Sequence, residues 1–149
     1  MANFATSCVQ DLIAKINAVP EIKKHTVQVY DQVALLNKTK AINPPFAGVI
    51  YDGMFSNHQK GKVGSNATLQ CSIMLAESGQ SLHPLTKGKD SIAKDKSTEL
   101  LDDIRDCIRL TKSPTGHSWE FVSEEIMPFE SGLFFYLQRW QTTAILTQV

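Results

Sequence analysis

The sequence predicts an α+β domain with two layers, in which two helices pack on a mainly antiparallel sheet. Two segments carry apolar residues at helical spacing, and five others have the β-branched and aromatic residues typical of strands. Their order along the chain, helix, strands, long loop, helix, strands, fits a two-layer arrangement. The 149 residues fit one domain spanning 1–149, since a single core is most often built from roughly 100 to 150 residues.

An amphipathic helix is predicted at the start of the chain, over residues 4–19. Its apolar side chains recur every three or four positions, and Pro20 follows directly after it. Residues 25–32 alternate Val27 and Val29 with polar neighbours. This alternation predicts a short strand that need not belong to the core sheet.

A hairpin with a long tip is predicted next, after the chain-breaking prolines in 43–45. Residues 46–55 run apolar and predict a buried strand, and residues 67–76 carry further β-forming side chains. The stretch 56–66 between them is polar and rich in Gly and Lys. Residues 77–97 have almost no periodicity, and a loop of this length within a compact domain is usually functional or flexible.

The clearest helix lies in the second half of the chain, over residues 98–111. Leucine and isoleucine occupy one of its faces and charged residues the other, and Ser97 can serve as its N-cap. Two strands follow, over residues 119–126 and 133–146, joined by a turn that contains Pro128.

The last strand has an unusual distribution of side chains. Both of its faces begin apolar and become polar toward the end, which predicts a strand that is buried at its start and emerges at an edge or subunit contact. Arg139 and Trp140 are of the types that anchor interfaces. Alternation divides the strand between Phe134, Tyr136, Gln138 and Trp140 on one face, and Phe135, Leu137, Arg139 and Gln141 on the other.

The charges balance overall but not along the chain. Fifteen basic residues match fifteen acidic ones, so no global field draws the protein to nucleic acid or to an anionic membrane. Residues 1–97 hold eleven lysines and seven acids, giving +4, and residues 98–149 hold eight acids and four basic residues, giving −4. Opposite charges at two edges would favour head-to-tail contact between copies, but the charges alone favour the interpretation of a mixed surface charge without purpose.

The cysteines predict core residues and a reducing compartment. Cys8, Cys71 and Cys107 are odd in number, widely spaced and set in apolar runs, so neither a disulfide framework nor a metal site is expected. The amino terminus lacks the pattern of a signal peptide, and no run approaches 18 apolar residues. These observations predict a cytoplasmic protein without a membrane anchor.

No catalytic, cofactor-binding or metal-binding constellation is predicted. The glycines form no phosphate-binding loop, and the acidic pairs do not converge. Four histidines are too far apart to share a ligand or proton-transfer site: His25, His58, His83 and His117.

Lysines gather in the two long loops. They could contact phosphates, but the loops lack aromatic residues that would stack on bases, so a protein partner is favoured over sequence-specific nucleic acid. Four of these lysines are candidates for such an interface: Lys60, Lys62, Lys87 and Lys89.

Three segments together resemble the tail-terminator and minor tail proteins of bacteriophages and prophages, of the Mu-like and lambda-like kind. Residues 45–53 (PFAGVIYDG) look like that family's strand ending in an aromatic residue, one further residue and a glycine. Residues 99–105 (ELLDDIR) are similar to its second helix, and residues 136–143 (YLQRWQTT) to its closing hairpin. With the opening helix, the match in element order covers nearly the whole chain.

The resemblance implies a structural role without catalysis or cofactor. Such proteins are monomeric or weakly associated in solution and close into a six-membered ring on the last ring of the tail tube. There they end its polymerisation and present a surface to the head-completion or connector protein. They act in the host cytoplasm during assembly and then in the tail or neck of the virion, where DNA passes through the ring. The expected subunit or tube interface comprises the four loop lysines, Arg139 and Trp140.

Two alternatives stay open at this point. Another neck or connector protein of the same assembly would bind on the head side of the tail. A small ligand-binding or enzymatic α+β domain would need a pocket between sheet and helices, lined by His117, Trp119 or Glu124.

Overall fold

In the residues that it describes, a computed structural model of the chain has two helices and five strands. Side chains are described for the helices and strands except at residues 27–28, 65, 77–78, 89–98, 127–130 and 133–134. The elements are α1 (Phe4–Asn17), β1 (Val27–Gln28), β2 (Phe46–Ser56), β3 (Ser65–Ser78), α4 (Lys89–Ile108), β4 (Glu120–Glu130) and β5 (Leu133–Leu146). The structure describes residues 3–20, 22, 27–28, 46–56, 65–78, 89–130 and 133–146.

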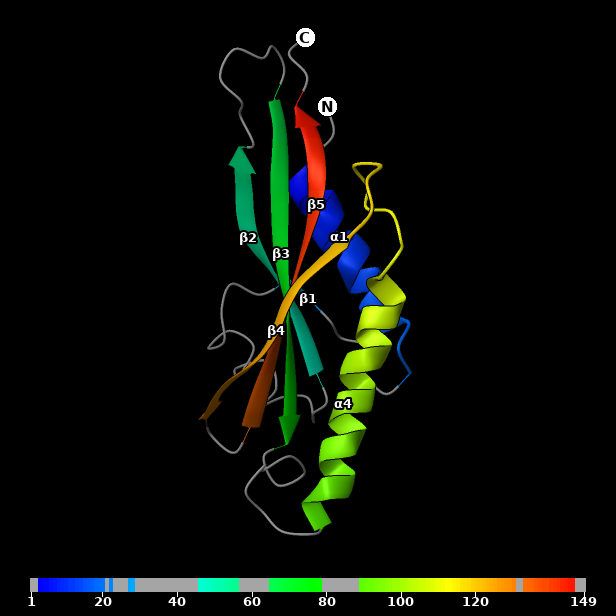
Figure 1. Ribbon diagram of the computed structural model, residues 1–149, viewed down its shortest axis with the longest axis vertical. Helices are drawn as coiled ribbons and strands as arrows, with labels where there is room; N and C mark the ends of the chain where they lie inside the picture. The colour runs from blue at the N-terminus through cyan, green and yellow to red at the C-terminus, as the bar shows by residue number, and fades with distance from the viewer. Residues whose placement is uncertain are drawn as a thin grey trace.

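The strands form one sheet in the order β1-β2-β3-β5-β4 (Figure 1). β1 runs parallel to β2, and every other neighbouring pair is antiparallel. The predicted α+β class with a mainly antiparallel sheet is therefore confirmed. The short strand expected over 25–32 comprises Val27 and Gln28 in the described chain, and it joins the sheet opposite Gly48 and Val49.

The predicted hairpin is confirmed as β2 and β3. Of its expected tip at 56–66, Ser56 belongs to β2, residues 65–66 belong to β3, and residues 57–64 lie outside the described residues. The register of the pair shifts between Tyr51 and Gly53, so Asp52 forms a β-bulge in β2. Gly53 has a φ of +134°, a backbone angle that residues with a side chain rarely adopt. The glycine thus permits the bulge that turns Asp52 out of the regular ladder.

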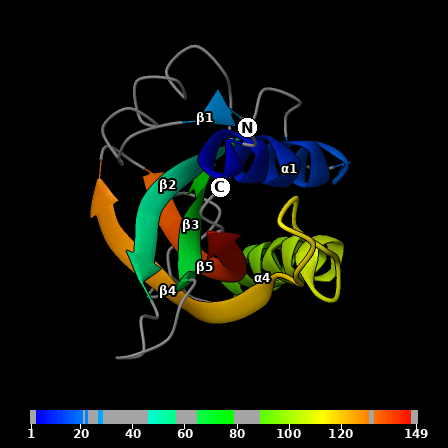
Figure 2. The ribbon, with the colours of Figure 1, turned by 90° about the horizontal axis from the view of Figure 1, so that it is seen from above.

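α1 confirms the predicted opening helix. The side chain of Asn3 caps it by accepting a hydrogen bond of 3.1 Å from the backbone nitrogen of Thr6. The helix lies on the same side of the curved sheet as α4 (Figure 2). It buries one apolar stripe against that sheet: Cys8, Val9, Leu12 and Ile16.

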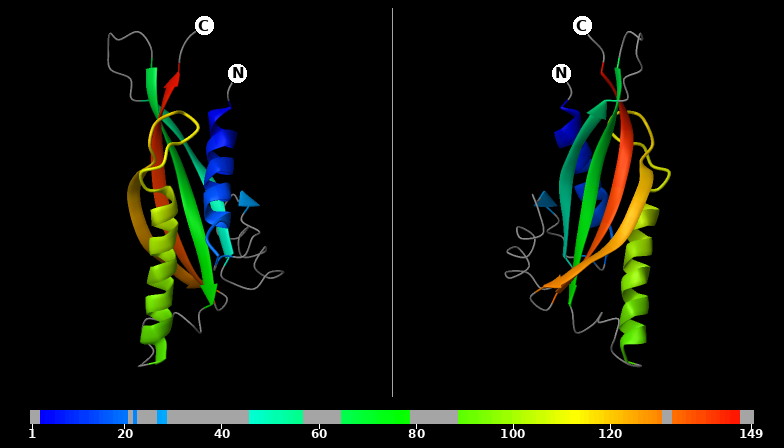
Figure 3. Two further views of the ribbon diagram at one scale, coloured as in Figure 1. Left: turned by 90° about the vertical axis from the view of Figure 1, so that its right-hand side faces the viewer. Right: turned by 60° about the vertical axis from the view of Figure 1, so that its left-hand side comes forward.

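α4 differs from the prediction at both ends. It begins at Lys89 rather than at residue 98, so Ser97 lies inside the helix and does not cap it, and residues 89–97 of the expected loop are helical. Residues 89–97 have no apolar stripe, but their lysines and alanine are good helix formers and extend a helix that the following turns already stabilise. This first part of α4 projects beyond the lower end of the sheet (Figure 3).

The end of α4 is a sharp reversal. The backbone nitrogen of Arg109 still bonds to the oxygen of Arg105 at 2.7 Å, and that of Thr111 bonds to Ile108 at 3.0 Å. Leu110 then adopts a positive φ of 64°, which terminates the helix earlier than the predicted residue 111.

β5 lies between β3 and β4, but β4 pairs with it only as far as Gln141, so residues 142–146 have β3 as their one paired neighbour in the described chain. The strand therefore starts inside the sheet and ends at an edge, as predicted. Along the first part of β5 the edge belongs to β4, which continues through Pro128 to Glu130 and so takes in part of the predicted turn. Its register with β5 shifts between Met127 and Glu130, where Pro128 cannot donate a ladder hydrogen bond.

The core lies between the helices and the sheet. Apolar side chains of α1, α4, β2, β3 and β5 meet there, and each fully buried leucine or isoleucine contributes about 1.5–3 kcal/mol. The largest fully buried side chains of the described chain include Trp140, Leu12, Ile16, Leu69, Ile73, Ile104 and Ile108.

Candidate assembly surface

Arg139 lies on the face of the sheet opposite the two helices. Its Cα partners are Ser72 on β3 and Ser123 on β4. The side chain is 40% exposed and forms an ion pair with Glu125, whose side chain is 46% exposed. Exposed ion pairs contribute about 0–1 kcal/mol, so this pair can yield to a carboxylate of another molecule at little cost.

A row of polar residues extends from Arg139 across four strands. Ser72 is buried and donates its hydroxyl hydrogen to a carboxylate oxygen of Asp52. Burial raises the pKa of Asp52, whereas the Ser72 hydrogen bond and the charge of Arg139 act in the opposite direction. Ser123 Oγ is buried and has no hydrogen-bond partner within the described chain. We call Asp52, Ser72, Arg139, Ser123 and Glu125 the polar row.

β4 presents the second notable surface, the open edge of the sheet. In the described part of the chain only β5 pairs with it. Phe121, Val122 and Ile126 are 45%, 42% and 61% exposed, and exposed Glu120 and Glu125 accompany them. An unpaired edge with exposed apolar side chains is a site where another strand can add to a sheet. We call these five residues the β4 edge.

The side chain of Trp140 does not belong to either surface. The prediction that it anchors an interface is corrected here, because the indole is 0% exposed and lies in the core. Its Nε1 donates to Gln138 Oε1 at 3.2 Å. The ring packs edge-to-face against Phe121, with centroids 5.5 Å apart at 73°. The buried indole of Trp140 therefore packs against the exposed Phe121 of the β4 edge.

Gln138 holds β4, β5 and α4 together, which the sequence analysis missed. It is 1% exposed, and its Nε2 donates to Leu101 O at 3.0 Å and to Glu124 Oε1 at 2.8 Å. Glu124 also forms an ion pair with Arg105 of α4. A polar side chain in mid-strand predicted exposure, and only the position of α4 reveals the carbonyl oxygen that the amide binds.

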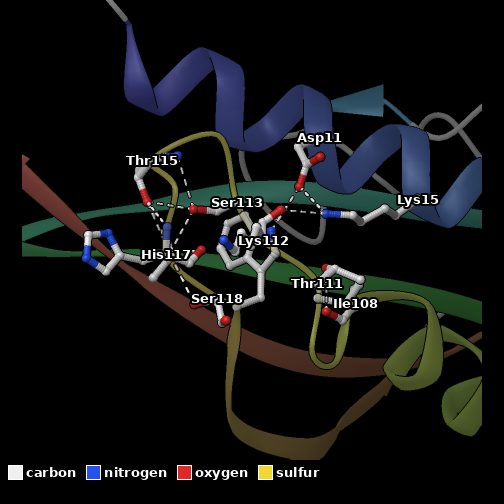
Figure 4. A network of polar contacts seen from close by, with 11 residues as sticks. Asp11, Lys15, Ile108, Thr111, Lys112, Ser113, Thr115, His117 and Ser118 are labelled. Atoms are coloured by element: carbon white, nitrogen blue, oxygen red, sulfur yellow. Dashed lines mark hydrogen bonds and ion pairs between the residues drawn. The ribbon is translucent and has the colours of Figure 1, made fainter.

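The connection between α4 and β4 is fixed to α1 by polar contacts (Figure 4). Lys15 Nζ donates to Asp11 Oδ2 at 2.6 Å and to Lys112 O at 3.2 Å. Trp119 Nε1 donates to the same oxygen of Asp11 at 2.9 Å. These contacts determine where β4 begins and so place the β4 edge relative to the core.

The same connection is also fixed to β5. Ser113 Oγ lies 2.8 Å from Thr142 Oγ1, and the backbone nitrogen of Ser113 donates to His117 O at 2.8 Å. Thr142 Oγ1 in turn donates to the carbonyl oxygens of His117 and Ser118 at 3.2 Å each. Gly116, with a φ of +90°, completes the turn. Residues 111–119 thus form a turn that hydrogen bonds to Thr142 hold against β5.

The three residues expected to line an enzymatic pocket have separate surroundings. Trp119 is 3% exposed and donates to Asp11 on α1. Glu124 binds Gln138 and Arg105, and His117 is exposed on the turn. Their polar groups do not converge on one another in the described structure.

The cysteines behave as the core residues that the sequence predicts, with Cys107 packed against the core cluster at its margin. Cys8 and Cys71 are buried, and Cys107 is partly exposed. Burial raises the pKa of the Cys8 thiol to about 11 and that of Cys71 to about 12. Both thiols therefore stay protonated and weakly nucleophilic at neutral pH.

The remaining predicted interface residues are mostly outside the described structure. Lys60, Lys62 and Lys87 lie there, and Lys89 is the first residue of α4, whose side chain is not described. Among the described residues, no group of three or more His, Cys, Asp or Glu side chains is placed to hold a metal ion.

Comparison with known proteins does not assign the chain to a family. No family model matches the sequence, and no curated protein is significantly similar to it. None of the helices in the described part of the chain has the length and apolar character needed to cross a membrane.

Proposed function

We propose that this protein is a structural component of a phage or prophage tail, which caps the tail tube as a ring and offers a surface for head joining. The proposal starts from the three segments that resemble tail terminators. Those segments form β2, the second half of α4 and β5, which are all central elements of the α+β fold.

The observation that carries the proposal is the β4 edge. Apolar side chains exposed by 42% to 61% on an unpaired strand are a liability for a protein that works alone. They are expected in a protein whose edge becomes covered during assembly. Arg139 and Glu125 extend this surface with charges that can exchange partners.

The direct test uses the tail-tube protein of the same phage. Tubes are polymerised with and without the purified chain, their lengths are measured by negative-stain electron microscopy, and native mass spectrometry gives the mass of the species at tube ends. We expect shorter tubes of limited length and a ring at one end of each tube. Unchanged tube lengths with bare ends would contradict the proposal.

A parallel pull-down separates the tube side from the head side. The tagged chain is offered tube protein and connector protein in separate reactions. Retention of tube protein supports a terminator. Retention of connector protein alone would instead identify another neck protein of the same assembly, and a terminator would be excluded.

A further inference from the structure

The sheet has two ends that are open to different degrees. β4 is the last strand at one end, and only β5 pairs with it in the described chain. At the other end, β1 pairs with Gly48 and Val49 alone. No described strand lies along the outer side of residues 50–55 of β2, which extend past β1 in the upper half of the sheet (Figure 1). We call residues 50–55 the β2 edge.

Both edges carry exposed apolar side chains. Phe55 on the β2 edge is 53% exposed, and Phe121, Val122 and Ile126 on the β4 edge are exposed to a similar degree. Backbone pairing between two such edges would remove these side chains from water. Each such burial is favourable by about 25 cal/mol per Å² of apolar surface.

The charges around the two edges are complementary. Glu120 and Glu125 are exposed on β4, so two β4 edges brought together would place acids opposite acids, which is destabilising. Residues 50–64, which comprise the β2 edge and the sequence after it, contain one acid, Asp52, and two lysines, Lys60 and Lys62, so their net charge is +1. Charge therefore favours contact between unlike edges over contact between two β4 edges.

We infer that the β4 edge of one copy adds as a strand to the β2 edge of the next copy. The inference rests on the proposed function, because it specifies the contact that closes the ring. The contact uses a different surface on each side, so it is heterologous and can be repeated around an axis. The occupant of the β4 edge is thus a second copy of this chain, and the sheet continues from copy to copy.

The first experiment blocks the edges one at a time. The double variant V122K/I126K places lysines on the β4 edge, and F55K places one on the β2 edge, where a charged side chain disfavours strand addition. All three positions are at least 42% exposed, so circular dichroism and thermal unfolding should match the wild type. L110K, at an 84% exposed position on the α4–β4 turn, is the matched control.

The oligomers are measured by native mass spectrometry in solution and at tube ends. Each edge variant alone should stay monomeric, and an equimolar mixture should give a heterodimer that grows no further, because one intact contact remains. L110K should assemble like the wild type. Dimers of F55K alone would show β4–β4 pairing, and a monomeric mixture beside wild-type rings would place the contact elsewhere. Either result overturns the inference.

A second measurement tests the contact in the assembled ring. Single cysteines, F55C and V122C, are introduced on separate copies that also carry Cys107→Ser, and mild oxidation follows. A disulfide between the two kinds of copy is expected only when they are mixed. If cross-linked copies form but tubes are not capped, the proposed function fails and the edge contact stands. If wild-type copies do not associate at all, the edge contact fails.

Discussion

At the scale of single residues, Gln138 is the polar side chain on which the junction of three elements depends. Its amide satisfies Leu101 O and Glu124 and accepts from the Trp140 indole. Gln138→Leu should therefore lower the free energy of unfolding by about 1–3 kcal/mol, because buried polar partners lose their hydrogen bonds. Urea denaturation measures the change. Gln141→Leu is the control, since its bond to Glu120 is exposed, and an equal loss in both variants would contradict the role of Gln138.

Arg139 is expected to affect assembly rather than folding. Arg139→Glu places a negative charge beside Glu125 and Asp52, so it should weaken ring formation while the monomer loses about 1 kcal/mol or less. Native mass spectrometry at a series of concentrations measures the association. Arg139→Lys keeps the charge and should assemble nearly as the wild type does. Unchanged assembly of Arg139→Glu would remove the polar row from the interface.

The free energy of unfolding should depend on pH through the carboxyl group of Asp52. Its pKa is raised above the ordinary value of 3.8, with burial as the largest cause, so the folded protein holds this proton more tightly than the unfolded chain. As pH rises from 3.8 through the raised pKa, the wild type loses stability relative to Asp52→Asn, which has no charge to bury.

The measurement for Asp52 is the difference in unfolding free energy between Asp52→Asn and wild type, from urea denaturation at a series of pH values. We expect the difference to shift in favour of the variant across that window and then to stay constant. A shift in favour of the wild type would show that Ser72 and Arg139 outweigh burial.

At the scale of elements, the position of Ser97 decides between two helix boundaries. An N-cap serine replaced by alanine costs about 1 kcal/mol, whereas replacement by glycine costs only a few tenths. Inside α4, where the structure places residue 97, the order reverses, because alanine favours a helix and glycine disfavours it by about 1 kcal/mol. Thermal unfolding of Ser97→Ala and Ser97→Gly measures this order. A less stable alanine variant would mean that the helix begins at residue 98.

The elements that the sequence predicts well are those with a periodic apolar pattern. α1, the β2–β3 hairpin and the β4–β5 pair follow from residues that alternate or recur every three to four positions. The first half of α4 lacks such a pattern, so the sequence predicts a loop there. The place of β5 inside the sheet depends on contacts between distant segments, which local alternation does not contain.

The residues of the candidate assembly surface were likewise predictable only where the local pattern of the sequence was sufficient. The sequence is sufficient to select Arg139 as a charged residue on a strand, and its side chain is partly exposed. Its neighbour Trp140 is buried, and this could not be predicted because it depends on which face of the sheet the helices cover. The polar row required the strand register, since Asp52, Ser72 and Ser123 are distant in sequence. The β4 edge required the strand order.

At the scale of the whole molecule, the unequal charges of the two halves of the chain make ring assembly sensitive to salt. Residues 1–97 carry +4 and residues 98–149 carry −4, counted from the sequence. The β2 edge belongs to the first half and the β4 edge to the second. Attraction between copies joined through these edges is screened when the Debye length falls from about 10 Å at 0.1 M salt to about 3 Å at 1 M.

Association of the wild type should therefore weaken as sodium chloride increases, and light scattering or native mass spectrometry measures the concentration at which half of the copies are assembled. Sodium sulfate at equal ionic strength screens charges too but strengthens apolar burial, so it should weaken association less. The difference between the two salts reports the contribution of Phe55, Phe121, Val122 and Ile126. V122K/I126K should stay monomeric in both salts, because its β4 edge cannot add to the next copy. Association that is independent of both salts would mean that neither the charges nor the exposed apolar residues of the two edges form the contact between copies.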